Sequence, residues 1–193
     1  MRTILKRILR GASVIVVFPF ALLCGFGAVS SVFAFCAQVV ALVPGLPGDY
    51  LRAAYYRLTV EKYGEYSRIS FGAFFAHPQV RIGRSVYIGS YSVIGRTSIG
   101  DRTQIASGVQ ILSGRRQHGR GPDGQLLSAD HDAFETVEIG ADCWIGAGAI
   151  IAADVGHGTT IGAGTIVIAP IPAGVVAVGN PARVLRSSGQ PAA

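Results

Sequence analysis

Large aliphatic residues recur over two stretches of the chain at intervals of six residues, with one interval of five and one of four. The positions are Ile82, Ile88, Val93, Ile99, Ile105 and Ile111, followed by Ile139, Ile145, Ile151, Val155, Ile161 and Val167. An α-helix buries every third or fourth residue, and a half-exposed strand buries every second one. Neither element explains a period of six. The pattern therefore indicates a repeat in which each unit contributes one inward-pointing aliphatic side chain.

Glycine and small residues keep the same register. Glycine directly follows the aliphatic residue at Gly83, Gly89, Gly100, Gly140, Gly146, Gly156 and Gly162, and four positions beyond the aliphatic residue come Ser, Thr, Cys, Ala or Val. Such a unit predicts one short strand and one bend. Stacked units pair as parallel strands, so we predict a parallel β-helix from about Ser67 to about Ala169. Ile69 and Phe75 extend the pattern into its first coil.

The segment before the repeats is apolar. Residues 11–48 contain no Asp, Glu, Lys or Arg, and the basic residues Arg2, Lys6, Arg7 and Arg10 precede them. A cleavable signal peptide has an apolar run of about 7–15 residues, which is much shorter. The segment therefore predicts membrane-associated helices at the inner membrane, with the N-terminus in the cytoplasm.

Two arrangements of this segment fit its length. One span needs about 20 residues, and two spans with a turn need about 40 or more. Pro19 and the stretch Gly25-Phe26-Gly27 can interrupt a helix. A single tilted span and a short helical hairpin that returns to the same face therefore both remain open.

A helix is expected next, from about Asp49 to Tyr63, with Asp49 as its N-cap. Its apolar stripe consists of Leu51, Tyr55 and Leu58. Its basic side chains, which can reach lipid headgroups, are Arg52, Arg57 and Lys62. A helix on the membrane surface and a helix that caps the end of the β-helix both fit this pattern.

These patterns divide the chain into segments. Residues 1–48 form the basic N-terminus and membrane segment, and residues 49–66 form the amphipathic helix and linker. Residues 67–186 form the β-helix domain, in which the polar loop 113–136 interrupts the repeats. A tail, 187–193, is expected to be disordered.

Composition excludes several classes of function. The chain of 193 residues carries a net charge of +6, and the four basic residues at the N-terminus account for most of it, so no nucleic-acid surface is expected. Three cysteines form an odd number, which gives no disulfide framework. Four scattered histidines argue against a hydratase with three histidines on zinc, so no metal is expected.

Three segments carry a family resemblance: IGADCWIGAGAIIAADVG (139–156), IGAGTIV (161–167) and GNPARVLR (179–186). Over about residues 65–186 the chain resembles the hexapeptide-repeat acyltransferases, especially the galactoside, maltose, xenobiotic and capsular-polysaccharide O-acetyltransferases. The resemblance implies a left-handed parallel β-helix, a homotrimer, active sites between neighbouring subunits, and acetyl-CoA as co-substrate.

The resemblance also implies positions for the coenzyme. Its pantetheine arm would lie along the coils against the small residues Ala147 and Ala163. Arg183 and Arg186 match basic residues that contact the coenzyme's phosphates. Where relatives often carry a basic residue after the last repeat, this chain has Ile168-Ala169.

In such enzymes the loop that interrupts the repeats carries a histidine as general base. A neutral imidazole takes the proton of the acceptor hydroxyl as it attacks the thioester. Here Arg116 stands where many relatives have that histidine, which leaves His118 as the first candidate and His131 as the second. His77 and His157 are interpreted as structural.

Other site residues have two interpretations each. The carboxylate that orients the histidine could be Asp132, with Asp123, Asp130 and Glu135 as alternatives. Trp144 should point outward, either packing between subunits or lining the acceptor pocket. Arg116 belongs either to a pocket for an anionic glycan or to a solvated basic loop.

The resulting hypothesis is acetyl transfer to a sugar hydroxyl of a surface-glycan precursor at the membrane. Membrane lipid and a lipid-linked or nucleotide-linked sugar would be partners. Because acetyl-CoA is cytosolic, the β-helix should face the cytoplasm. The alternatives are N-acetylation of an amino sugar, acetylation of a small molecule, and a trimeric scaffold without activity.

Overall fold

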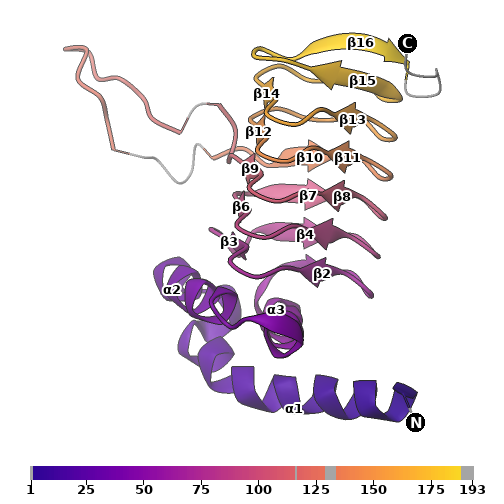
Figure 1. Ribbon diagram of the computed structural model, residues 1–193. Coiled ribbons are helices and arrows are strands. Elements are labelled where there is room, and N and C mark those ends of the chain that lie inside the picture. Colours follow the sequence, from indigo (N-terminus) through magenta and orange to yellow (C-terminus); the bar gives the residue numbers. More distant parts are fainter. Residues whose placement is uncertain (1, 116, 129–133, 188–193) are drawn as a thin grey trace.

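The computed structural model describes residues 2–115, 117–128 and 134–187. Arg116, Asp130, His131 and Asp132, together with the tail from residue 188, lie outside the described residues. Three α-helices are followed by a β-solenoid of stacked coils (Figure 1). The helices are α1 (Arg2–Leu23), α2 (Ser30–Ala41) and α3 (Gly45–Thr59), with a short 3-10 turn, η1 (Gly25–Gly27), between the first two.

The coils build three parallel sheets, one on each side of a prism. Sheet A contains β1 (Lys62–Tyr63), β4 (Val80–Ile82), β7 (Thr97–Ile99) and β10 (Val137–Ile139). Sheet B contains β2 (Arg68–Ile69), β5 (Tyr87–Ile88), β8 (Gln104–Ile105), β11 (Trp144–Ile145), β13 (Thr160–Ile161) and β15 (Val175–Val178), with β16 (Arg183–Ser187) antiparallel at its end. Sheet C contains β3 (Phe74–Phe75), β6 (Val93–Ile94), β9 (Gln110–Ile111), β12 (Ile150–Ile151) and β14 (Ile166–Val167).

The aliphatic ladder lies inside this prism, as predicted, with one exception. Ile105, Ile145 and Ile161 stack directly in register and are fully buried or nearly so. The assignment of Val93 to the ladder was wrong, because Val93 is 36% exposed and Ile94 is fully buried. Only one residue of a two-residue strand can point inward.

Small side chains form a second interior ladder. Most of their hydroxyls are satisfied by the backbone of a neighbouring coil, which makes their burial tolerable. The Oγ1 of Thr103 donates to the carbonyl of Gly140 at 2.7 Å, and that of Thr97 donates to the carbonyl of Val137 at 2.7 Å. Small polar residues therefore fill the tight bends of the prism.

The solenoid is one coil longer than predicted. Val155 pairs with Ile171, and β15 continues sheet B beyond Ala169. The last coil lacks the Ile-Gly pair because prolines surround Ile171, which hid it in the sequence. Strand β16 then covers the open edge of β15.

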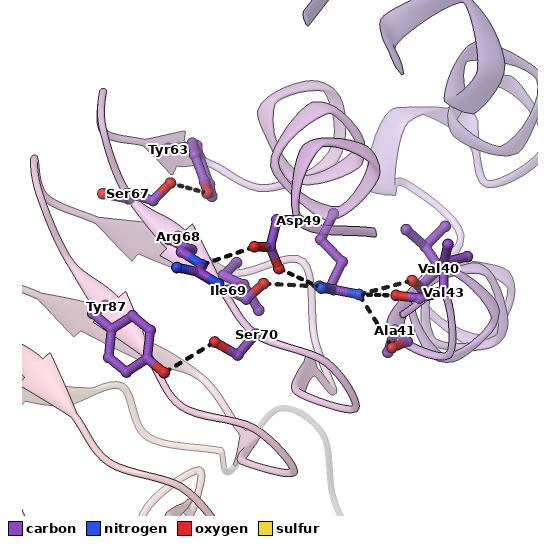
Figure 2. Close-up of polar contacts among 11 residues, drawn as sticks. Val40, Ala41, Val43, Asp49, Tyr63, Ser67, Arg68, Ile69, Ser70 and Tyr87 are labelled. Carbon is purple, nitrogen blue, oxygen red and sulfur yellow. Dashed lines mark hydrogen bonds and ion pairs between the residues drawn. The ribbon is translucent and has the colours of Figure 1, made fainter. Parts of the chain in front are cut away.

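The helices close the other end of the stack. Helix α3 starts at Gly45, earlier than predicted, because Pro47 is tolerated in a first helical turn, where an N–H would have no helical partner. Asp49 is therefore not the N-cap; it pairs with Arg52 and Arg68 (Figure 2). Arg52 is fully buried, so the expectation that it reaches headgroups was wrong.

Aromatic rings fasten the helices to the first coil. Tyr56 of α3 lies 4.4 Å from Phe75, measured between ring centroids, and Tyr55 stacks on Phe33 of α2 at 5.8 Å. All four rings are fully buried. The prediction that this helix caps the β-helix is thus confirmed. Within the described part of the chain, no helix combines the length and apolarity needed to cross a membrane.

Candidate active site

The corner between sheets B and C carries a line of small residues over three coils. We call it the small-residue edge; it consists of Ser107, Gly108, Ala147, Gly148, Ala163 and Gly164. Backbone hydrogen bonds hold it in register, since the N–H of Gly148 donates to Ser107 at 3.0 Å and that of Gly164 donates to Ala147 at 2.8 Å. The two alanines assigned to the coenzyme therefore lie one above the other.

The edge is open along its length. Gly148 and Gly164 have φ near +70°, the region where glycine is favoured, and a Cβ placed on either would meet no atom within 4 Å. Three coils at about 4.8 Å spacing give a strip about 10 Å long. A thin chain can lie there against the backbone.

Aromatic residues end the strip on the side of the helices. Tyr91 occupies the position equivalent to Gly108 one coil earlier, and it is 64% exposed. Its ring covers Gly72 and packs edge-on against Phe71 at 5.5 Å. The open strip is therefore confined to the C-terminal half of the prism.

A turn and two arginines lie at the other end of the strip. The N–H of Ile166 donates to Gly179 at 3.0 Å, which places the turn before β16 on top of this corner. Arg183 follows the turn and is exposed. The Nη1 of Arg186 is shielded from solvent and has no hydrogen-bond partner among the described residues. Arg183 pairs with Val178, the last residue of β15, and so lies beside this end, whereas Arg186 lies farther along the strand, opposite Val176.

Trp144 and Cys143 lie on opposite faces of sheet B. Trp144 points outward, as expected, and is 61% exposed between Gln104 and Thr160. Cys143 points inward, and its Sγ donates to the carbonyl of Gly156 at 3.1 Å. Burial raises the pKa of the Cys143 thiol, so it is a poor nucleophile.

The loop between β9 and β10 leaves the prism at a different corner, between sheets C and A (Figure 1). At its base, Arg115 donates to the carbonyl of Ile168 at 3.0 Å. Farther out, Arg120 and Leu126 pair as an antiparallel bridge, so the loop is hairpin-like. It projects away from the prism.

His118 lies on this hairpin and is exposed. Its Nδ1 is 3.2 Å from the carbonyl oxygen of Leu127. A carbonyl can only accept, so in this hydrogen bond Nδ1 carries the proton and Nε2 of the neutral ring is left with a free lone pair. In that tautomer Nε2 is the nitrogen that can act as a general base. Of the candidate carboxylates, Asp123 accepts from the N–H of Gln125 in its own turn.

The loop returns to the prism at Phe134. His77 packs edge-on against this ring at 5.2 Å between centroids, and the guanidinium of Arg96 lies over it at 5.4 Å. The N–H of Glu135 donates to the carbonyl of Ser113 at 3.1 Å, which closes the base of the loop. The sequence did not place His77 or Arg96 near the loop, because both lie on earlier coils.

One chain brings only part of the predicted site together. Ala147 and Ala163 share one corner, with Arg183 beside its end and Arg186 farther along β16. His118 belongs to another corner, and sheet C lies between the two. No group of His, Cys, Asp and Glu in the described ranges is arranged to hold a metal ion.

The repeats of this architecture match those of a known protein family. The family described as "hexapeptide repeat of succinyl-transferase" matches residues 79–113 and 136–169, the two blocks on either side of the loop. A search of curated proteins finds no significant match.

Solved structures share this fold over most of the chain. A hexapeptide-repeat-containing acetyltransferase from Vibrio cholerae matches with a TM-score of 0.68 at 18% identity, covering 88% of this chain and 94% of its own. A galactoside acetyltransferase in complex with coenzyme A matches with a TM-score of 0.65 at 24% identity, covering 86% and 82%. A maltose O-acetyltransferase from Clostridium difficile 630 matches with a TM-score of 0.64 at 21% identity, covering 86% and 88%. The chain therefore has the β-helix fold of these acetyltransferases, and its two blocks of repeats match the hexapeptide-repeat family model.

Proposed function

We propose that this protein is an acetyl-CoA-dependent O-acetyltransferase that modifies a sugar hydroxyl of a surface-glycan precursor at the cytoplasmic face of the inner membrane. The observation that carries the proposal is the small-residue edge, open over three coils, with the exposed Arg183 beside its end. The fold shared with galactoside and maltose acetyltransferases supports the same reaction class.

The coenzyme fits this strip chemically. Its pantetheine arm is narrow and carries amide groups that can hydrogen-bond to exposed backbone at Ala147 and Ala163. Its phosphates suit the guanidinium groups of Arg183 and Arg186, because guanidinium binds phosphate through paired N–H groups. A larger side chain on the strip would occupy the space of the arm.

The chemistry requires one base and no acyl-enzyme. The acceptor hydroxyl oxygen attacks the thioester carbonyl carbon while Nε2 of His118 takes its proton. The carbon–sulfur bond then breaks, and the histidine returns the proton to the thiolate that leaves. A neutral imidazole with a free Nε2 is suited to both steps.

The geometry supports a site shared between subunits. In one chain the loop and the small-residue edge lie at different corners, so His118 of one subunit would meet the coenzyme on a neighbour. Three prisms packed side by side as a homotrimer give three such sites. Trp144, exposed on the sheet beside the edge, would then pack between subunits or line the acceptor pocket.

The reaction is tested by mass spectrometry of the surface polysaccharide from cells with and without the protein. Loss of a mass that corresponds to acetyl groups, restored by the wild-type chain, is the expected result. The purified full chain should also transfer acetyl from acetyl-CoA to that glycan or its precursor. A polysaccharide of unchanged acetyl content, with no transfer in solution, would refute the proposed function.

The Ala147→Leu variant is expected to bind acetyl-CoA about tenfold more weakly or worse. Inserting a larger side chain into occupied space typically costs about 1–3 kcal/mol, and about 1.4 kcal/mol changes affinity tenfold. Isothermal titration calorimetry on the full chain gives the dissociation constant.

Ala141→Leu is the matched control, because Ala141 is the position equivalent to Ala147 in the preceding bend of the same coil, between sheets A and B. The equivalent positions on neighbouring coils are Asp101 and His157, so this corner accepts large side chains. We expect its affinity to stay within about twofold of wild type. Equal affinities for the two leucine variants would show that the coenzyme does not use the strip.

A further inference from the structure

The helical end of the molecule exposes an unusual amount of apolar surface. Thirteen of the 22 exposed large hydrophobic side chains among the described residues lie between Ile8 and Leu46. They are Ile8, Leu9, Ile15, Val16, Phe18, Leu22, Leu23, Phe26, Val29, Phe35, Val39, Leu42 and Leu46. Large apolar surfaces of this kind mark sites that bind a protein or a membrane when they are exposed in a soluble protein.

On α1 these residues form one face. Val17 and Ala21 are buried and mark the side that packs on the rest of the protein, whereas Ile15 is 76% exposed and Leu22 is 60% exposed. Helix α1 lies across the end of the stack (Figure 1), so its exposed face points away from the prism. Copies that pack side by side along the prism would leave this face uncovered.

Positive charge gathers at the same end. Residues 1–68 contain eight basic and three acidic residues, a net charge of +5, whereas the remaining residues contribute only +1. An apolar face with surrounding positive charge matches a bilayer that contains anionic lipid. It does not match the interior of another protein, where unpaired charge is costly.

A pocket lies between α1, α3 and the first coil. Its volume is about 250 Å³, and its walls include Leu46, Tyr50 and Ala53. Arg10, Arg57 and Arg68 are among the residues that line it, and Asp49 is the one acidic residue among them. Since Arg68 is paired with Asp49 at 2.8 Å, the charges of Arg10 and Arg57 are left without a carboxylate in the pocket.

We propose that the helical end lies flat on an anionic bilayer, with α1 and α2 in the interface and a lipid phosphate in this pocket. Interfacial helices bury their apolar face about 5–10 Å into the boundary between headgroups and acyl chains. Arg10 lies on the side of α1 opposite Ile15. With α1 flat on the bilayer, Arg10 is therefore farther from the bilayer centre than Ile15 by one helix diameter, about 10 Å. That height places it among the headgroup phosphates. The proposal stands independently of acetyl transfer.

Vesicle flotation of the full chain tests the docking. The protein should float with vesicles of phosphatidylcholine and 30% phosphatidylglycerol about tenfold more tightly than with phosphatidylcholine alone, and salt should weaken the difference. Aggregated protein stays at the bottom of the gradient. Equal partition into the two vesicle types, or no flotation at all, would overturn the proposal.

The pocket is tested by the double variant Arg10→Gln, Arg57→Gln. We expect its affinity for the anionic vesicles to fall about tenfold or more. The double variant Arg84→Gln, Arg102→Gln removes the same charge from bends of the coils and should retain affinity within about threefold. Equal losses in the two variants would mean that the net charge of the molecule, and not the pocket, holds the phosphate.

The apolar face is tested by Ile15→Glu, Leu22→Glu, which should abolish flotation while circular dichroism stays unchanged. Leu185→Glu is the control, since Leu185 is 63% exposed on β16 at the far end of the prism. Analytical ultracentrifugation tests whether a second copy of the chain, and not a bilayer, covers this face. If Ile15→Glu, Leu22→Glu dissociates an oligomer and the wild type does not float, the face binds protein and the proposal fails.

Discussion

Replacing His118 with alanine is expected to lower the rate of acetyl transfer by about 100-fold to 10,000-fold, the range that a positioned general base contributes. The hydroxyl of a sugar is a poor nucleophile at neutral pH, so without a base the attack on the thioester must release its proton to water. The measurement is steady-state acetyl transfer from acetyl-CoA to the glycan acceptor. The dissociation constant for acetyl-CoA should remain close to that of wild type.

Two further measurements separate catalysis from folding. His157→Ala is the matched histidine control, because His157 is exposed on a bend between sheets A and B and has no role in the proposed chemistry. It should retain activity within about twofold. Added imidazole should restore part of the activity of His118→Ala, since a free base can occupy the vacated space. If His131→Ala loses activity and His118→Ala does not, the assignment of the base is wrong.

The β-helix could be predicted from the sequence because its core is periodic. Each coil repeats the same inward position, so a local pattern reports directly on the stacked ladder. The inward-pointing residue was predicted wrongly only at Val93 and Ile94, where two adjacent residues are both aliphatic. Spacing alone could not choose between them, because either choice leaves one interval of five residues. In the structure that interval lies between Ile94 and Ile99.

The small-residue edge could be predicted from the sequence for the same reason. Ala147 and Ala163 occupy equivalent places in successive coils, so an alignment of repeats brings them together without any knowledge of side-chain contacts. The loop offers no such guide, because residues 113–136 leave the repeat and their position depends on tertiary packing. His77 and Phe134 meet there from distant parts of the chain, and no spacing rule predicts that contact.

The helical end was the least predictable part. Its apolar residues indicated contact with lipid. The apolar stripe of Leu51, Tyr55 and Leu58 fitted both a helix on the membrane surface and a helix that caps the β-helix. The role of Arg52 could not be anticipated, because its partners are backbone carbonyls, which every residue has. Burial of an arginine is so costly that sequence reasoning places it outside by default.

Removing Arg52 is expected to cost about 3–5 kcal/mol of folding free energy, the loss found when one partner of a buried ionic network is deleted. Its Nε donates to the carbonyl of Ile69 at 2.8 Å, and its Nη1 donates to that of Val43 at 2.7 Å (Figure 2). Its Nη2 bonds Asp49 at 2.7 Å. One guanidinium thus joins the end of α2, helix α3 and the first coil, and Arg52→Ala leaves all these acceptors without their donor.

Urea unfolding of the full chain, followed by circular dichroism, should give a graded series. Arg57→Ala, on the same helix but exposed, should lose less than about 1 kcal/mol, the value of an exposed cation over a ring such as Tyr63. Arg52→Lys should fall between the two, because an ammonium keeps the charge but cannot reach acceptors in three directions. If Arg52→Lys matches wild type, charge alone suffices and the fork of donors is not what holds the helices to the prism. If Arg52→Ala costs no more than Arg57→Ala, the helices are held by their aromatic rings, and the buried guanidinium contributes no net stability.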